Sequence, residues 1–117
     1  MRPVKFDTEE TGNIAIVRLS GEFSPRKDCD RVLKFYERLG ENPRHVIINL
    51  EKVKTVSSWV LAIVSSLHKM LAEYKRRIYV VKKTDDVRLI LIVAGLDKDV
   101  EVFPDEESAI VRVEGFF

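Results

Sequence analysis

Short runs of apolar and β-branched residues alternate along this chain with longer segments of helical periodicity. The predicted strands lie at residues 4–7, 14–19, 46–50, 78–81 and 100–103. The predicted helices lie at residues 26–39, within 53–74, at 85–94 and from residue 104 onwards. Strands separated by such helices are usually parallel, whereas the first strand, joined to the second by a tight turn at residues 9–13, should be an antiparallel edge strand. The pattern predicts an α/β fold with a small mixed, mostly parallel sheet of about five strands and four helices, in the order β-β-α-β-α-β-α-β-α.

The length and the balanced charge of the chain exclude several classes of protein. Of its 117 residues, 45% are hydrophobic and 33% charged, so residues 1–117 are expected to form one domain with its own core. The apolar fraction excludes disorder, and no run approaches the roughly 18 apolar residues of a membrane span. A net charge of +1 gives no electrostatic reason to bind nucleic acid or a membrane surface. The first residues lack the apolar stretch of a signal peptide, so a cytoplasmic protein is expected.

The low content of amide side chains indicates a protein from a thermophilic organism. Glutamine is absent and asparagine occurs only at Asn13, Asn42 and Asn49, whereas Lys, Arg and Glu are abundant. Proteins that work at high temperature avoid labile amides and gain from ion-pair networks. We therefore expect a thermophilic source.

The first predicted helix contains an apolar stripe and the only cysteine of the chain. The stripe consists of Cys29, Val32, Leu33, Tyr36 and Leu39. Gly40 follows it and is expected to end the helix. A single cysteine forms no internal disulfide, and its apolar helix position predicts a packed thiol.

Motifs for catalysis, metals and cofactors are missing from the sequence. The two histidines, His45 and His68, have no partner at the spacing of a metal site, and packed or capping roles are expected for both. No glycine-rich phosphate loop and no Gly-x-Ser-x-Gly occurs. The sequence therefore predicts no catalytic residue, metal or cofactor.

One polar feature remains at a strand-to-helix junction. Ser57 and Ser58 follow a buried strand and precede an apolar helical face, which consists of Val60, Leu61, Val64, Leu67, His68 and Leu71. Sites in open α/β sheets lie in loops that leave the carboxyl ends of parallel strands. Each serine can be a helix cap. Alternatively, one can be a phosphorylation switch, since a phosphoryl group would meet free N–H groups and the positive end of the helix dipole.

From about Asn13 to Val113 the chain resembles the STAS domain, and in particular the bacterial anti-sigma-factor antagonists. Residues 19–24, Leu-Ser-Gly-Glu-Phe-Ser, resemble the family's Leu-Thr-Gly-Glu-Leu-Asp. Residues 45–51 resemble its central strand, and Ala94-Gly95-Leu96 stands where the family has Ser-Gly-Leu. Val102-Phe103, followed by Ala109, matches the family's ending. The order and spacing of these fragments together carry the resemblance.

The resemblance implies a regulator rather than an enzyme. In that family the unmodified antagonist binds an anti-sigma factor that is itself a serine kinase, and this binding frees the sigma factor. Phosphorylation of a serine in an Asp-Ser-x-Gly motif separates the complex, and a serine phosphatase resets it. Here the matching residues make Ser58 the expected phosphoacceptor, with Ser57 as second choice. Ser57 replaces the family aspartate and Val60 replaces the glycine, whose absence is expected to block close approach of another backbone.

The resemblance also places a docking surface in three loops, around Ser24, Ser58 and Thr84. The expected partner-binding residues are Glu22, Ser24, Ser57, Ser58, Trp59 and Thr84. Trp59 would be an anchor for a protein partner if exposed and a core residue if buried.

Two other functions are weighed against this one. The departures at Ser57 and Val60 favour a STAS interaction module that is not phosphorylated, or a small-ligand sensor. A serine hydrolase using Ser57 or Ser58 would need a base that the sequence does not offer. A homodimer could form through the edge strand near Val4 or through the apolar residues 115–117.

Overall fold

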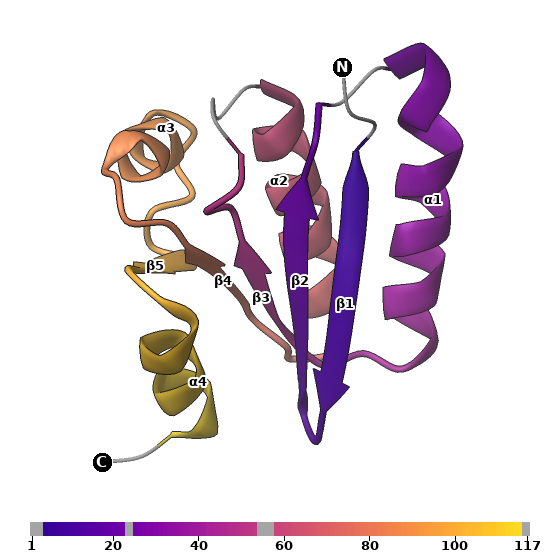
Figure 1. Cartoon of the computed structure of the whole chain (residues 1–117). Helices are drawn as coiled ribbons and strands as arrows, with labels where there is room; N and C mark the ends of the chain where they lie inside the picture. The colour runs from indigo at the N-terminus through magenta and orange to yellow at the C-terminus, as the bar shows by residue number, and fades with distance from the viewer. Residues whose placement is uncertain (1–3, 23–24, 54–57, 116–117) are drawn as a thin grey trace.

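The computed structural model describes residues 4–22, 25–53 and 58–115, which form five strands and four helices (Figure 1). The strands are β1 (Lys5–Thr11), β2 (Ile14–Ser20), β3 (His45–Asn49), β4 (Ile78–Val81) and β5 (Val100–Phe103). The helices are α1 (Pro25–Glu41), α2 (Ser58–Ala72), α3 (Asp86–Val93) and α4 (Glu106–Glu114). The predicted α/β class and the predicted order of elements are confirmed.

The five strands form one mixed sheet in the order β1-β2-β3-β4-β5. β1 is antiparallel to β2 at one edge, as predicted, and the other pairs are parallel. The predicted turn at residues 9–13 is too long, because β1 continues to Thr11, which pairs with Ile14. The turn consists of Gly12 and Asn13, and Gly12 has a φ of 54°, which a glycine adopts without strain in a two-residue hairpin loop.

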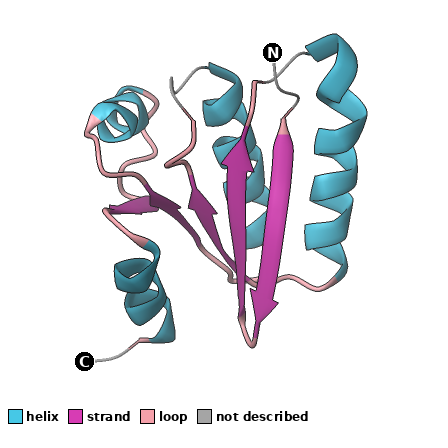
Figure 2. Ribbon diagram, viewed as in Figure 1, coloured by secondary structure: helices cyan, strands magenta, loops and turns pink. Residues whose placement is uncertain are grey.

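Helices cover both faces of the sheet (Figure 2). On one face, alternate strand residues such as Val46, Ile48 and Val80 pack with α1, α2 and α3 in the larger core cluster. On the other face, Ile47, Tyr79 and their neighbours pack against Ala109 of α4. The near-continuous apolar composition of β3 and β4 follows from this double burial.

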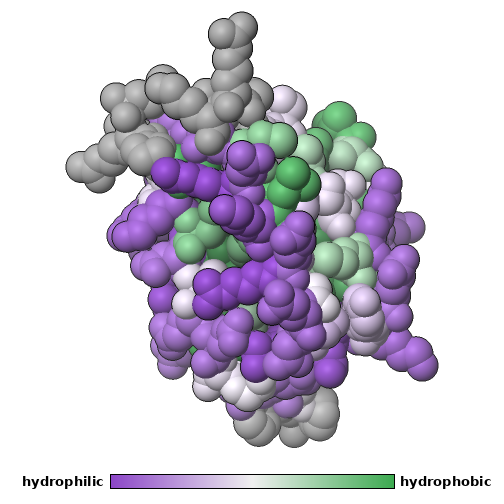
Figure 3. Space-filling model, turned by 90° about the vertical axis from the view of Figure 1, so that its right-hand side faces the viewer, coloured by the Kyte–Doolittle hydropathy of each residue, from purple (hydrophilic) through white to green (hydrophobic). Residues whose placement is uncertain are grey.

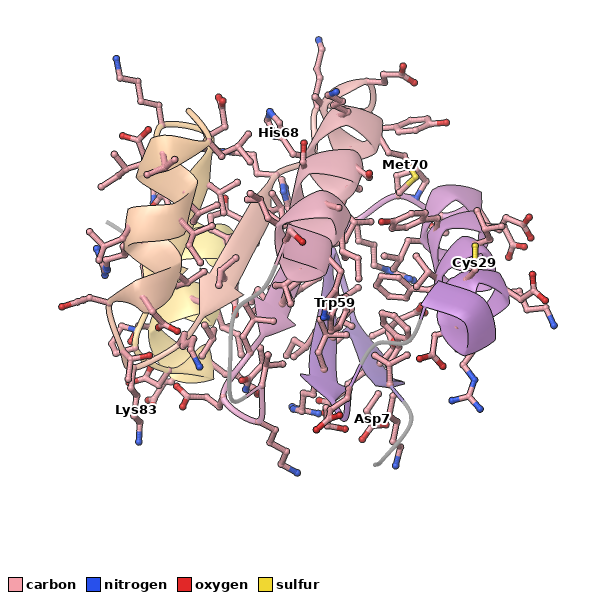
Figure 4. All side chains as sticks on the ribbon, turned by 90° about the horizontal axis from the view of Figure 1, so that it is seen from above. Asp7, Cys29, Trp59, His68, Met70 and Lys83 are labelled. Carbon is pink, nitrogen blue, oxygen red and sulfur yellow. The ribbon has the colours of Figure 1, made fainter. Side chains whose placement is uncertain are left out.

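The face that α1 buries agrees with the predicted stripe only in part: Val32, Tyr36 and Leu39 pack against the larger core cluster, whereas Cys29 and Leu33 do not. Phe35 and Leu39 are buried, and Phe35 stacks on Phe6 of β1 with ring centroids 4.4 Å apart. Leu33 is 52% exposed and Cys29 is exposed, so the predicted packed thiol is wrong (Figure 4). Cys29 and Leu33 lie four residues apart, so they share one side of the helix, and that side turns to solvent. Figure 3 shows this side of the molecule as mainly hydrophilic, with smaller hydrophobic areas.

Gly40 does not end α1, contrary to the prediction, because the helix continues to Glu41. The side chain of Met70 on α2 comes close instead: a Cβ added at Gly40 would lie 3.6 Å from Met70 Sδ, an ordinary contact distance. A larger residue would therefore fit at position 40, and glycine only lowers the stability of the helix there. Gly95, in contrast, ends α3 as predicted, with a φ of 75°.

We expect Gly40→Ala to raise the free energy of unfolding by about 0.5–1 kcal/mol, because alanine loses less backbone entropy in a helix and finds room beside Met70. Gly95→Ala is the matched control and should lower it, since alanine is strained at positive φ. Urea denaturation of both variants measures the two changes. A loss of stability in Gly40→Ala would show that α1 and α2 have no room for the methyl group.

Candidate partner-binding and phosphorylation site

The candidate residues lie at the edge of the sheet where the parallel strands have their carboxyl ends. Arg18 of β2 is level with Asn49 of β3, Asn49 with Val81 of β4, and Val81 with Phe103 of β5, so these parallel strands end together. Glu22, Ser58 and Thr84 follow the ends of β2, β3 and β4 respectively, and the chain there leads into α1, α2 and α3 (Figure 1, top). The sheet thus brings the three loops to the same end of the molecule. Ser24 and Ser57 lie outside the described residues.

Ser58 is the first residue of α2 and its side chain is exposed. It makes no side-chain hydrogen bond with another residue of the part that the structure describes. The first four N–H groups of a helix have no partner within the helix, and the helix dipole is positive at this end. An exposed hydroxyl at this position is open to a kinase, and a phosphoryl group on it would lie in a favourable field.

The two residues after Ser58 turn toward the protein to different extents. Trp59 is half-buried and packs against the larger core cluster, so it is neither the fully exposed anchor nor the fully buried residue that were weighed (Figure 4). Val60 is 1% exposed and belongs to that cluster. The side chain of Val60 therefore points into the core and does not face an incoming partner, while its effect on the close approach of another backbone stays a prediction.

Thr84 contributes a polar contact at the start of α3. Its hydroxyl donates a hydrogen bond to Asp86 Oδ1, and this bond is the main reason why the pKa of Asp86 is lowered. Asp85 occupies the N-cap position without a side-chain capping bond. Glu22 is also exposed, and side chains of both signs lie around Ser58, because Lys52 and Lys83 of the same loops are exposed as well.

An ion-pair network fixes α4 to the same edge of the sheet. Arg18 donates from Nε and Nη2 to the two carboxylate oxygens of Glu106, both at 2.8 Å, and from Nη1 to Glu9 at 3.1 Å. Asn49 also donates to Glu106, while its own side-chain oxygen accepts from the N–H of Glu51 at 2.8 Å. Bidentate pairing of this kind is the stronger form of ion pair. The hydrogen bond from Arg18 is the main cause of the lowered pKa of Glu106.

Acid should weaken the fold through His45 and Glu106. His45 Nδ1 accepts a hydrogen bond from the backbone N–H of Arg77 at 3.1 Å, and burial, with Arg76 and Arg77, lowers the pKa of His45. A lowered pKa means that the unfolded chain binds the proton more readily. The stabilisation is therefore complete above the unfolded pKa and is lost as the pH falls through the folded pKa. We expect the thermal midpoint to fall by a few degrees from about pH 7.5 to 5.5 through His45, and further below about pH 4.5 through Glu106.

Thermal melts of His45→Gln and Glu106→Gln across this pH range assign the two steps. His45→Gln should lose the upper step and keep the lower one. Glu106→Gln should keep the upper step and reduce the lower one, since the lowered pKa values of Asp86 and Asp105 also contribute there. A midpoint that rises as the pH falls from about 7.5 to 5.5 would contradict the lowered pKa of His45.

Neither histidine is placed to serve as a base for Ser58. His45 is the first residue of β3, so it lies at the amino ends of the parallel strands, whereas Ser58 lies at their carboxyl ends. His68 lies on α2 ten residues beyond Ser58, which is about 15 Å along the helix axis. Its Nε2 lies 3.8 Å from Asp99 Oδ2. The serine-hydrolase alternative therefore has no support from the described residues.

The described residues also bear on other kinds of site. No group of three or more His, Cys, Asp or Glu side chains there could hold a metal ion, and no helix there is long and apolar enough to span a bilayer. A pocket of about 310 Å³ lies between α3 and β5. The side chains that line it come from Arg88, Leu91, Ile92, Asp97, Val100, Glu101 and Val102. Of the candidate partner-binding residues that the structure describes, none lines it.

Comparison with known proteins gives the family of the chain. The model of the STAS domain matches residues 5–109. The chain belongs to the STAS domain family. No curated protein sequence matches this STAS domain significantly.

Solved structures of anti-sigma factor antagonists share its fold. The anti-sigma factor antagonist SpoIIAA in its unphosphorylated form is 22% identical, with 97% of this chain and 99% of that chain covered and a TM-score of 0.77. An anti-sigma factor antagonist from Mycobacterium paratuberculosis is 21% identical, with 95% and 94% covered and a TM-score of 0.77. The Bacillus cell fate determinant SpoIIAA in the phosphorylated form is 22% identical, with 93% and 99% covered and a TM-score of 0.72. This likeness confirms the predicted STAS fold.

Proposed function

We propose that this STAS domain is an anti-sigma-factor antagonist controlled by phosphorylation of Ser58. In its unphosphorylated form it binds an anti-sigma factor that is also a serine kinase, and this binding releases the sigma factor. The observation that carries the proposal is the exposed hydroxyl of Ser58 at the first position of α2, at the edge where the loops after β2, β3 and β4 meet. Support comes from the similar antagonist SpoIIAA, which has been solved in unphosphorylated and phosphorylated forms.

Charge explains how the modification would act. A phosphoryl group adds about −1.5 to −2 charges at neutral pH. The positive end of the α2 helix dipole stabilises that charge, so the fold stays intact. The added charge and bulk exclude a partner surface that has packed against the small, uncharged hydroxyl. A serine phosphatase then restores the binding form.

The docking surface of the proposal consists of the loops that flank Ser58. Glu22 and Thr84 supply polar contacts, and the half-buried Trp59 supplies its exposed part as an apolar one. Ser24 and Ser57 belong to the same surface in the proposal, although both lie outside the described residues. Ser57 remains the second choice as phosphoacceptor.

Mass spectrometry after incubation with ATP and the kinase-type anti-sigma factors of the source organism tests this function. We expect one phosphoryl group on Ser58 in the wild type and none in Ser58→Ala. Phosphorylation of Ser57 instead of Ser58, in the wild type and in Ser58→Ala alike, would reassign the switch to Ser57. A chain that takes up no phosphate on either serine would remove the switch.

A second function is supported by the departures from the family motif. Ser57 and Val60 stand where the family has Asp and Gly, so the domain could be a constitutive interaction module or a small-ligand sensor. The pocket between α3 and β5 offers such a ligand a place. Equal binding of one partner by wild type and Ser58→Ala, without any phosphorylated form in cells, would favour this function over the first.

A further inference from the structure

Lys82 is a buried charged residue directly beneath the candidate site. It follows β4, and its backbone N–H extends the ladder by donating to Phe103 O at 3.0 Å. Strand residues alternate between faces, so Lys82 points, like Ile78 and Val80, to the face covered by α1, α2 and α3. Its side chain is 9% exposed, and Lys83 beside it is exposed and directed outward (Figure 4).

The ammonium group of Lys82 holds the start of the connection from β3 to α2. Nζ donates to Val53 O at 2.9 Å and to Leu50 O at 3.4 Å. These carbonyls are the two ends of a turn that is closed by a bond from the N–H of Val53 to Leu50 O at 3.0 Å. Leu50 and Val53 are both buried, so water does not replace the lysine as a donor without rearrangement of the turn.

The same charge reaches the next loop of the site. Attraction to Lys82 is one of the lesser causes that lower the pKa of Asp86, whose side chain accepts the hydrogen bond from Thr84. One buried cation thus connects the loop that leads to Ser58 with the loop that contains Thr84. A buried lysine with main-chain partners is expensive to desolvate, and an apolar side chain would serve the core better if packing were its only role.

We propose that Lys82 is a positioning residue: it holds the turn at residues 50–53, after β3, and thereby presents Ser58 to the partner and its kinase. The proposal rests on the proposed function for its second half. The first half, the hold on the turn at residues 50–53, is independent of any partner.

The test compares the full chain with Lys82→Met, which keeps the length and removes the charge, and with Lys83→Met as the matched control. Amide exchange is followed by NMR. In Lys82→Met the Val53 amide should exchange at least tenfold faster, while the amides of Ile47 and Ile48 keep their rates. Lys83→Met should match the wild type throughout. Unchanged exchange at Val53, or a uniform increase that includes Ile47 and Ile48, would overturn the hold on the turn.

Lys82→Arg provides the rescue, because a guanidinium can donate to the same two carbonyls. Exchange at Val53 should return to within about threefold of the wild type, and a rate as fast as that of Lys82→Met would overturn the role of the donated bonds. The partner arm uses a kinase-type anti-sigma factor that binds the wild type. Its affinity should fall at least tenfold in Lys82→Met and stay unchanged in Lys69→Met, whose exposed lysine lies in the last turn of α2, outside the proposed docking surface.

The two arms separate the failures of the two proposals. An unchanged affinity together with faster exchange at Val53 would overturn the presentation of Ser58 by Lys82. A wild type that binds none of the anti-sigma factors would refute the proposed function, and the exchange arm would still decide whether Lys82 holds the turn.

Discussion

Val60→Gly, which restores the glycine of the family motif, is expected to lower the free energy of unfolding by about 3 kcal/mol. Val60 is fully enclosed in the larger core cluster, so the substitution removes three buried carbon atoms and leaves a cavity. Glycine adds a smaller loss through its backbone entropy in the helix. Urea denaturation of the two proteins measures the difference.

Ala62→Gly is the matched control for this substitution. Ala62 lies on the same helix but is exposed, so the change should cost only about 1 kcal/mol of helix propensity. Partner affinity should stay within about threefold of the wild type in both variants, because neither side chain is part of the proposed docking surface. A Val60→Gly variant as stable as Ala62→Gly would contradict the placement of Val60 in the core.

Ser58→Asp is expected to weaken binding of the anti-sigma factor at least tenfold, a change of about 1.4 kcal/mol in binding free energy. The new carboxylate places a negative charge at the position of the hydroxyl, on an edge where Glu22, Asp85 and Asp86 are already exposed or partly exposed. The fold should not suffer, because an acidic residue in the first turn of α2 interacts favourably with the helix dipole. Isothermal titration with the partner and a thermal melt of the variant measure the two effects.

Thr11→Asp is the control for added charge. Thr11 is exposed at the end of β1, at the other end of the sheet from Ser58 (Figure 1). This variant should bind the partner as the wild type does. An equal loss of affinity in both variants would show that net charge, rather than charge at Ser58, controls binding.

The sequence predicted those parts of the fold that are set by local signals. β4 and β5 lie where the runs at 78–81 and 100–103 place them, because each run is rich in β-branched and aromatic residues. The helix predicted from residue 104 onwards is α4, which Asp105 caps with a side chain that accepts from the N–H of Ser108 at 2.8 Å. α2 begins at Ser58, as the serine pair at the head of an apolar face predicted.

Features decided by contacts between distant segments were missed. The end of β1 contains Glu9, Glu10 and Thr11, a poor strand sequence by itself, and it is a strand because it pairs with residues 14–16 of β2. The buried face of α1 depends on Phe6, which selects Phe35 rather than Leu33 for the core. Periodicity alone does not distinguish two apolar stripes that overlap on one helix.

The candidate site divides in the same way. Its position at the carboxyl ends of the parallel strands followed from the order of elements, and the structure confirms that Glu22, Ser58 and Thr84 share this edge. The burial of Lys82 was missed, because lysine is almost never fully buried and a pair of lysines after a strand normally marks a solvated loop. The sequence does indicate this burial, because Lys82 follows Ile78 and Val80 at every second position and strand residues alternate between the two faces.

The most direct measurement is the affinity of the full chain for a kinase-type anti-sigma factor before and after complete phosphorylation of the same preparation. We expect the unmodified chain to bind, the phosphoryl group to map to Ser58, the affinity to fall at least tenfold, and treatment with a serine phosphatase to restore it. A fully phosphorylated chain that binds as tightly as the unmodified one would contradict the regulation proposed here.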